Sequence, residues 1–304
     1  MRLLALVLAA LAATLPAQQK PGRNEGPQKD GLGRDYWVYA PKRASSKPLW
    51  LVVGVHGMGG TGQGAGGLAA WATQRDDCLV LGPTFPSQGY QFLAQESDTQ
   101  LLRLVEDLGK RHKLQPRVFL AGFSGGAQYV HRFAHAHPDK VLAVAANSAG
   151  SWSTGGQWGE INPAARLVPM LVTCGEADTG KMAAEAPFGR LEWAKDYVRR
   201  LREGGFVVAE AYPAKVGHSF SPEAQKLTAE LFAFATTRAT ELARQREALA
   251  ALVSKGDRAG AARLADRSRL MVAAVVPTTP KAHWEQGLAK AHNAAIDELL
   301  KAAR

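Results

Sequence analysis

A glycine-flanked serine in the middle of the sequence, Gly-Phe-Ser-Gly-Gly at residues 122–126, is the feature that most constrains the fold. The apolar run Val118–Ala121 precedes it, and a helix-like run follows it from Ala127. Glycines on both sides of a serine permit a tight turn with an unusual backbone conformation, which lifts the hydroxyl of Ser124 above the edge of a sheet. The pattern alone arises easily by chance in a glycine-rich chain, so its weight comes from the strand–turn–helix context.

Short β-branched runs alternate with longer amphipathic runs from Asp35 onward, which predicts an α/β fold with a mostly parallel sheet flanked by helices. Apolar residues recur at helical spacing over 98–112 and 191–202. Ser221 is followed by a proline and an acid, as at a helix N-terminus. The predicted strands are Tyr36–Tyr39, Trp50–Val55, Cys78–Leu81, Val118–Ala121, Leu142–Ala146, Met170–Cys174 and Val207–Tyr212.

The two ends of the chain differ from its middle in composition. Residues 1–17 have the charged start, short apolar run and small-residue exit of a signal peptide, with cleavage expected after Ala17, and so predict a secreted or periplasmic protein. Residues 18–34 are rich in Gly, Pro and polar residues and predict a flexible lead-in. Residues 35–237 are then the α/β domain, and residues 238–304, rich in Ala, Leu and Arg, predict a C-terminal helical extension.

Charge and cysteine content narrow the classes of partner. The formal net charge is +10, but the Lys and Arg residues are scattered among acids without interleaved aromatic residues, which favours a solvated basic surface over a nucleic-acid site. The apolar run of the signal is too short for a permanent membrane span, and no later stretch is long enough, so no stable membrane insertion is expected. Cys78 and Cys174 lie in apolar runs and are expected to be buried thiols.

A glycine-rich loop, His-Gly-Met-Gly-Gly at residues 56–60, follows the apolar strand 51–55. Glycines allow backbone N–H groups to point at a ligand, and an attacking serine needs such donors for the negative oxygen that forms. The expected oxyanion hole consists of the N–H groups of Met58 and Gly125. A plain glycine-rich turn remains an equal alternative for this loop.

A serine hydroxyl needs a base to take its proton and a third group to orient that base. Asp178 follows the strand that begins at Met170, and His218 follows the strand that begins at Val207. Both would lie at the carboxyl edge of the sheet, where Ser124 also lies. Asp178 is preferred over Glu176 as the acid because a short turn separates it from the strand, although a helix-capping role for Asp178 is also open.

Taken together, these motifs resemble the α/β-hydrolase superfamily, and most closely its secreted esterases related to polyhydroxybutyrate depolymerases, feruloyl and acetyl-xylan esterases, and dienelactone-hydrolase-like proteins. The matching segments are residues 36–41, 56–60, 122–126, 175–178 and 217–218, and the resemblance covers about residues 35–236. It implies Ser124 as nucleophile, Asp178 as acid and His218 as base, with no metal and no organic cofactor. It does not distinguish one ester from another.

The segment 147–168 is too short for the helical cap that buries the site in many members of this superfamily, so we expect an open cleft that accepts a bulky or polymeric ester. Trp152 and Trp158 lie in this segment, and Tyr90 lies in the loop after the strand 78–81. These aromatic residues are the expected substrate contacts, with packing in the core an equal alternative for each.

The leading function is a carboxylic ester hydrolase acting outside the cell membrane on an aryl, acetyl-sugar or polyester substrate. A serine peptidase of the prolyl-oligopeptidase type would have the same order of catalytic residues, but the chain has no propeller domain and no obvious acidic pocket for a peptide amino terminus. A non-catalytic binding protein on the same scaffold is the third alternative, and the complete set of candidate residues counts against it. The oligomeric state is not indicated by the sequence.

Overall fold

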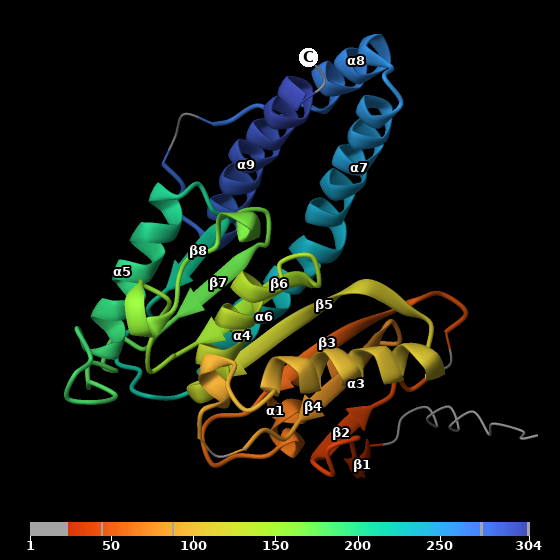
Figure 1. Ribbon diagram of the computed structural model, residues 1–304. Helices are drawn as coiled ribbons and strands as arrows, with labels where there is room; N and C mark the ends of the chain where they lie inside the picture. Colours follow the sequence, from red (N-terminus) through yellow and green to blue (C-terminus); the bar gives the residue numbers. More distant parts are fainter. Residues whose placement is uncertain (1–23, 44, 87, 274–275, 303–304) are drawn as a thin grey trace, which may run out of the picture.

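An eight-stranded sheet forms the centre of the molecule, with the strand order β1-β2-β4-β3-β5-β6-β7-β8 (Figure 1). The computed structural model describes residues 24–302 apart from residues 44, 87, 274 and 275. Strands β1 and β2 run antiparallel to their neighbours, and β3 to β8 run parallel to one another. The strands are β1 Asn24–Lys29, β2 Asp35–Tyr39, β3 Leu49–Val55, β4 Cys78–Pro83, β5 Leu114–Phe123, β6 Val141–Asn147, β7 Met170–Thr173 and β8 Val208–Ala211.

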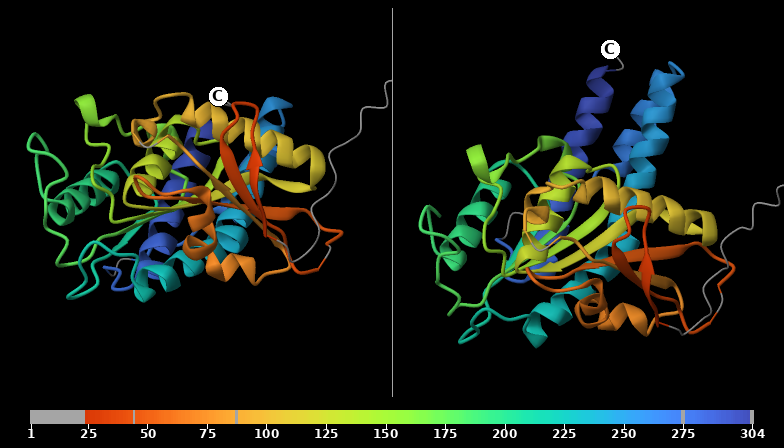
Figure 2. Two further views of the ribbon diagram at one scale, coloured as in Figure 1. Left: turned by 90° about the horizontal axis from the view of Figure 1, so that it is seen from below. Right: turned by 60° about the horizontal axis from the view of Figure 1, so that its bottom comes forward.

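Helices cover both faces of this sheet (Figure 2). One face packs against α3, α4 and α5, and the other packs against α1, α2, α6 and the first half of α9. The α-helices are α1 Ala65–Leu68, α2 Ala70–Thr73, α3 Ser97–Arg111, α4 Gly125–Ala136, α5 Arg190–Glu203, α6 Pro222–Phe234, α7 Thr240–Ser254, α8 Arg258–Ser268 and α9 Pro280–Ala302. Short 3-10 segments are η1 Gly62–Gly64, η2 Tyr90–Phe92, η3 Gly156–Trp158 and η4 Pro163–Ala165, and a π-helical segment, η5, spans Ala235–Ala239.

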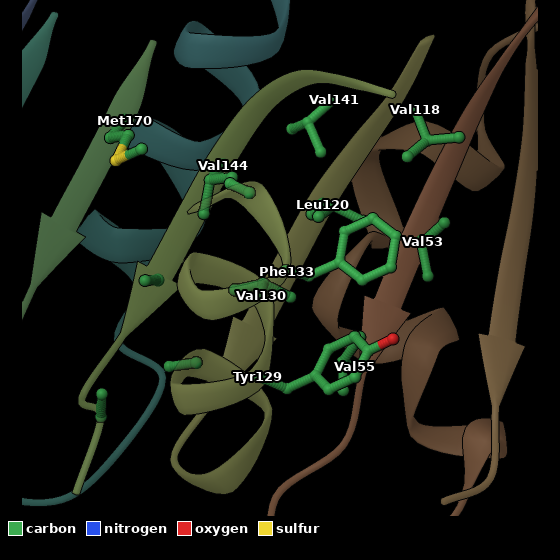
Figure 3. Packing of buried hydrophobic residues seen from close by; sticks show 14 of the residues in the cluster. Val53, Val55, Val118, Leu120, Tyr129, Val130, Phe133, Val141, Val144 and Met170 are labelled. Carbon is green, nitrogen blue, oxygen red and sulfur yellow. The ribbon is translucent and has the colours of Figure 1, made fainter. Parts of the chain in front are cut away.

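The central strands read as continuous apolar runs because both of their faces are buried. In β5, Val118 and Leu120 point to the α4 side, whereas Phe119 and Ala121 point to the α6 side. Figure 3 shows Leu120 and neighbouring valines of the sheet packed against Tyr129 and Phe133 of α4. The helix that follows the candidate nucleophile is therefore fixed by the core of the protein.

The C-terminal helices extend the molecule beyond the sheet (Figure 1). Helix α6 continues through η5 into α7, so the predicted boundary at 237/238 falls inside an unbroken helical run. In α9, Trp284 is fully buried against the sheet, and its Nε1 donates a hydrogen bond to the carbonyl oxygen of Met170 at 2.8 Å. Further out, Leu249, Ala261, Ala265 and Ile296 form a small separate cluster between α7, α8 and α9.

The predicted α/β class, the mostly parallel sheet and the C-terminal helical extension are confirmed. The prediction of a flexible lead-in is wrong for residues 24–34, because β1 pairs with β2 and Tyr36 donates its hydroxyl hydrogen to Oε1 of Gln28 at 2.7 Å. An edge strand of polar residues has no hydrophobic alternation by which the sequence could reveal it. Residues 18–23 and the expected signal peptide, residues 1–17, lie outside the described residues.

Two further expectations concern thiols and membranes. Cys78 and Cys174 are free and buried, as predicted. Within the part of the chain that the structure describes, none of the helices is long and apolar enough to span a bilayer.

Candidate active site

Ser124 lies in a strained turn between β5 and α4. Its backbone has φ 56° and ψ −117°, a conformation that side-chain-bearing residues rarely adopt and that usually marks a functional position. A Cβ atom on Gly122 would overlap the backbone of Gly126, and one on Gly126 would overlap the carbonyl of Val55. The two outer glycines of the motif are therefore required by close packing.

A continuous hydrogen-bonded chain runs from Asp178 to Ser124. Nδ1 of His218 lies 2.7 Å from Oδ2 of Asp178, and Nε2 of His218 lies 3.0 Å from Oγ of Ser124. With the proton on Nδ1 donated to the carboxylate, Nε2 is free to accept the hydroxyl proton of the serine. This is the arrangement of nucleophile, base and orienting acid that acyl-transfer chemistry needs.

Asp178, the acid of this hydrogen-bonded chain, is buried, whereas Glu176, the alternative acid, is exposed. Asp178 is 4% exposed, and its Oδ1 also accepts a charge-assisted hydrogen bond from Nη1 of Arg190 at 3.4 Å. Burial, together with the nearby Asp178, raises the pKa of the Cys174 thiol to about 12, so it stays protonated 3.8 Å from Oδ2. Glu176 points into solvent. The structure thus places Asp178, and not Glu176, beside the imidazole.

The glycine-rich loop packs against Gly125, the residue that follows Ser124. The amide nitrogen of Met58 would lie 3.0 Å from a Cβ built on Gly125, and in the described part of the chain neither amide has an acceptor. His56 holds the loop, because its Nδ1 donates to the carbonyl of Gly57 at 2.7 Å and its Nε2 accepts from the N–H of Phe85 at 3.0 Å. Burial lowers the pKa of His56, which keeps it neutral in this role.

Two of the three expected substrate contacts are wrong. Trp152 is fully buried and stacks on Tyr197 with ring centroids 5.0 Å apart, so it is part of the core. Tyr90 is also fully buried, beneath the glycine-rich loop. Trp158 is half-buried and reaches the surface beside Phe92, an exposed residue that the sequence interpretation did not single out.

Arg132 ties together the segments that frame the site, although nothing in the sequence indicated this role. Its five N–H groups donate to the carbonyl oxygens of Gln91, Gln128 and Trp158 and to Oγ of Ser151, at 3.0 to 3.4 Å. Burial lowers the pKa of Arg132, since none of these acceptors is a carboxylate. Segment η2, helix α4 and the loop after β6 are thereby held in one arrangement.

The site is open above the serine. Between β6 and β7 the described residues form only the short segments η3 and η4, so no helical cap covers the carboxyl edge of the sheet. A shallow depression of about 480 Å³ adjoins the site and is lined by His56, Gly57 and Phe123 among others. The ring of Phe123 packs against the imidazole of His218, with ring centroids 5.0 Å apart.

The described side chains do not form a metal site. The described residues contain no group of three or more His, Cys, Asp or Glu side chains arranged around a common point. On α4, His131 and His135 are one turn apart, but their ring nitrogens are already used. His131 contacts the carbonyl of Ala127 and the N–H of Ser153, and His135 contacts Tyr197 and the N–H of Asn162.

No family model and no curated protein matches the sequence. Among solved structures, the chain is similar to poly(aspartic acid) hydrolase-1 from Sphingomonas sp. KT-1, with a TM-score of 0.53 and 20% identity, covering 64% of this chain and 93% of that one. It is similar to S-formylglutathione hydrolase FrmB from Staphylococcus aureus, with a TM-score of 0.52 and 13% identity, covering 72% of this chain and 100% of that one. It is also similar to FphF, a fluorophosphonate-binding serine hydrolase of Staphylococcus aureus, with a TM-score of 0.51 and 13% identity, covering 71% of this chain and 99% of that one.

His135, a histidine buried near the C-terminal end of α4, predicts a pH-dependent stability. Burial, aided by the charge of Arg132, lowers the pKa of His135 to about 4, below its ordinary value near 6.5. The unfolded chain therefore binds more protons between these values, and stability that is present above pH 6.5 is lost as the pH falls toward 4. At about 1.4 kcal/mol per pKa unit, His135 accounts for about 3 kcal/mol of this loss.

We expect His135→Gln to flatten the dependence of the unfolding free energy on pH between 7 and 4.5, measured by urea denaturation. Tyr197→Phe is the matched control, because it removes the hydroxyl that contacts His135 but keeps the imidazole. An equally steep dependence in His135→Gln and in the parent protein would contradict the assignment.

Proposed function

We propose, from the premise that the chain has the α/β-hydrolase fold, that it is a serine-dependent carboxylic ester hydrolase working through an acyl-enzyme. One observation carries the proposal: the hydrogen-bonded chain from Asp178 through His218 to Ser124, at 2.7 and 3.0 Å. The strained backbone of Ser124 and the two amides beside it support the same reaction.

The geometry supports a two-step reaction. Oγ of Ser124 attacks the ester carbonyl while Nε2 of His218 takes the hydroxyl proton, and the N–H groups of Met58 and Gly125 donate to the resulting oxyanion. The tetrahedral intermediate breaks its bond to the alcohol oxygen, which leaves with the proton from His218 and leaves an acyl ester on Ser124. Water, deprotonated by His218, then attacks the acyl carbonyl. The bond between the acyl carbon and Oγ of Ser124 breaks, His218 returns the proton to Oγ, and the carboxylic acid is released. Asp178 orients the imidazole and stabilises its protonated form.

The open site supports the proposed substrate class. With no helical cap among the described residues, a bulky or polymeric ester has access to Ser124. Trp158 and Phe92 lie together at the surface with ring centroids 6.4 Å apart, and aromatic surfaces of this kind stack on sugar or aryl rings. An aryl, acetyl-sugar or polyester substrate therefore suits the site best.

The reaction is tested by comparing the parent protein with Ser124→Ala. We expect turnover of p-nitrophenyl acetate and of feruloyl or acetyl-sugar esters that falls to background in Ser124→Ala, together with mass labelling of Ser124 by a fluorophosphonate. Absence of Ser124-dependent turnover on every ester would contradict the proposal. Turnover of aminoacyl amides in preference to esters would favour a peptidase instead.

The acid is tested by two isosteric substitutions. Asp178→Asn should lower kcat by up to about 10⁴-fold, because an amide cannot hold His218 in the productive tautomer or stabilise its charge. Glu176→Gln is the control, since Glu176 is exposed and does not reach the imidazole. A larger loss in Glu176→Gln than in Asp178→Asn would reverse the assignment.

We also propose that the protein acts outside the cytoplasm. The charged start and short apolar run of residues 1–17 support this, with cleavage after Ala17. Expression with the native N-terminus should give an exported protein whose first residue, by N-terminal sequencing, is Gln18. Cell-associated protein that retains Met1 would contradict export.

A further inference from the structure

Tyr90 lies directly beneath the glycine-rich loop and does not face the cleft. Its side chain is fully buried, and its hydroxyl donates a hydrogen bond to the carbonyl oxygen of His56 at 2.7 Å. The ring stacks on Phe85 with centroids 5.3 Å apart and an interplanar angle of 15°. Burial raises the pKa of Tyr90, so the hydroxyl keeps the proton that it donates.

The same hydroxyl is in contact with the start of α4. A Cβ atom on Gly125 would lie 2.7 Å from the hydroxyl oxygen of Tyr90, 2.9 Å from Cγ of Met58 and 3.0 Å from the amide nitrogen of Met58. Gly125 does not have a positive φ, so its backbone conformation is open to any residue. Glycine is needed at this position because the Tyr90 hydroxyl and the Met58 loop occupy the space of a side chain.

The segments on either side of Tyr90 in the sequence are also held in place by hydrogen bonds. The carbonyl oxygen of Gln91 accepts a hydrogen bond from Nη1 of Arg132 at 3.4 Å, which links η2 to the middle of α4. Nε2 of His56 accepts from the N–H of Phe85 at 3.0 Å, which links the glycine-rich loop to the segment before η2. The hydroxyl is therefore held between two anchored segments.

We propose that Tyr90 is a positioning residue whose hydroxyl sets the spacing between the N–H groups of Met58 and Gly125. The inference rests on the proposed function, in which these two groups receive the oxyanion. The hydroxyl donates a hydrogen bond to the His56 carbonyl and fills the space next to Gly125. It thereby fixes both amides relative to Ser124 before a substrate binds. Such preorganisation acts on the transition state more than on substrate binding, because the oxyanion forms only during the reaction.

The first test is Tyr90→Phe, with Tyr129→Phe as the matched control. Tyr129 is equally buried in the same cluster, but its hydroxyl donates to the carbonyl of Ser97 at 3.0 Å instead of to the glycine-rich loop. We expect Tyr90→Phe to lower kcat on p-nitrophenyl acetate about 10- to 100-fold with KM changed less than about twofold, as for a small misplacement of catalytic groups. Tyr129→Phe should keep the parent kcat even where thermal unfolding shows a similar loss of stability.

The second test uses the contact with Gly125. Gly125→Ala alone should lower kcat, because the new methyl group collides with the Tyr90 hydroxyl and displaces the loop. Adding Tyr90→Phe removes that hydroxyl, while the flexible Met58 side chain can move aside, so the double variant should be more active than Gly125→Ala. A purely structural tyrosine would give additive losses.

The outcomes separate the two proposals. Two outcomes overturn the role of Tyr90 and leave the ester hydrolase intact, provided that the parent protein shows Ser124-dependent turnover. One is equal kcat in Tyr90→Phe and Tyr129→Phe, and the other is additive losses in the double variant. No Ser124-dependent turnover in the parent protein overturns both.

Discussion

The strained backbone at Ser124 is the constraint on which the site depends. Holding a non-glycine residue at φ 56° costs on the order of 1–3 kcal/mol, so the surrounding contacts have to enforce it. The N–H of Ser124 donates to the carbonyl of Asn147 at 2.9 Å, and Gly126 packs directly on the backbone at Val55. Two neighbouring parallel strands thus hold the turn from both sides, and α4, fully packed in the core, prevents it from relaxing.

The three members of the hydrogen-bonded chain differ in burial: Asp178 is buried, Ser124 is half-buried and His218 is exposed. The Asp178 side chain is 3% exposed and that of His218 is 34% exposed. A carboxylate with two cationic or polar partners stays fixed where water cannot compete for it, whereas the proposed reaction requires the imidazole to move protons and to admit the substrate. Arg190, at the first residue of α5, supplies the second partner of Asp178. The helix after the acid therefore orients the acid as well as covering the sheet.

The fold and the hydrogen-bonded residues Asp178, His218 and Ser124 could be predicted from the sequence because each depends on a local pattern. Apolar runs locate the central strands, and a loop after a parallel strand places its residues at one edge. Contacts between distant segments leave no such pattern. Trp152 and Tyr90 lie in loops near the site, but whether a loop aromatic faces solvent or the core depends on what packs above it. For Arg132 and Arg190, no spacing in the sequence indicates their partners.

The C-terminal extension and the acid lie at opposite ends of one short strand. Trp284 of α9 hydrogen-bonds to the carbonyl of Met170, the first residue of β7, and the loop that carries Asp178 leaves the other end of that strand. Four residues of strand span about 13 Å, so the extension is fixed to the amino edge of the sheet while the chemistry lies at the carboxyl edge. Packing of α9 therefore stabilises β7 without approaching Ser124.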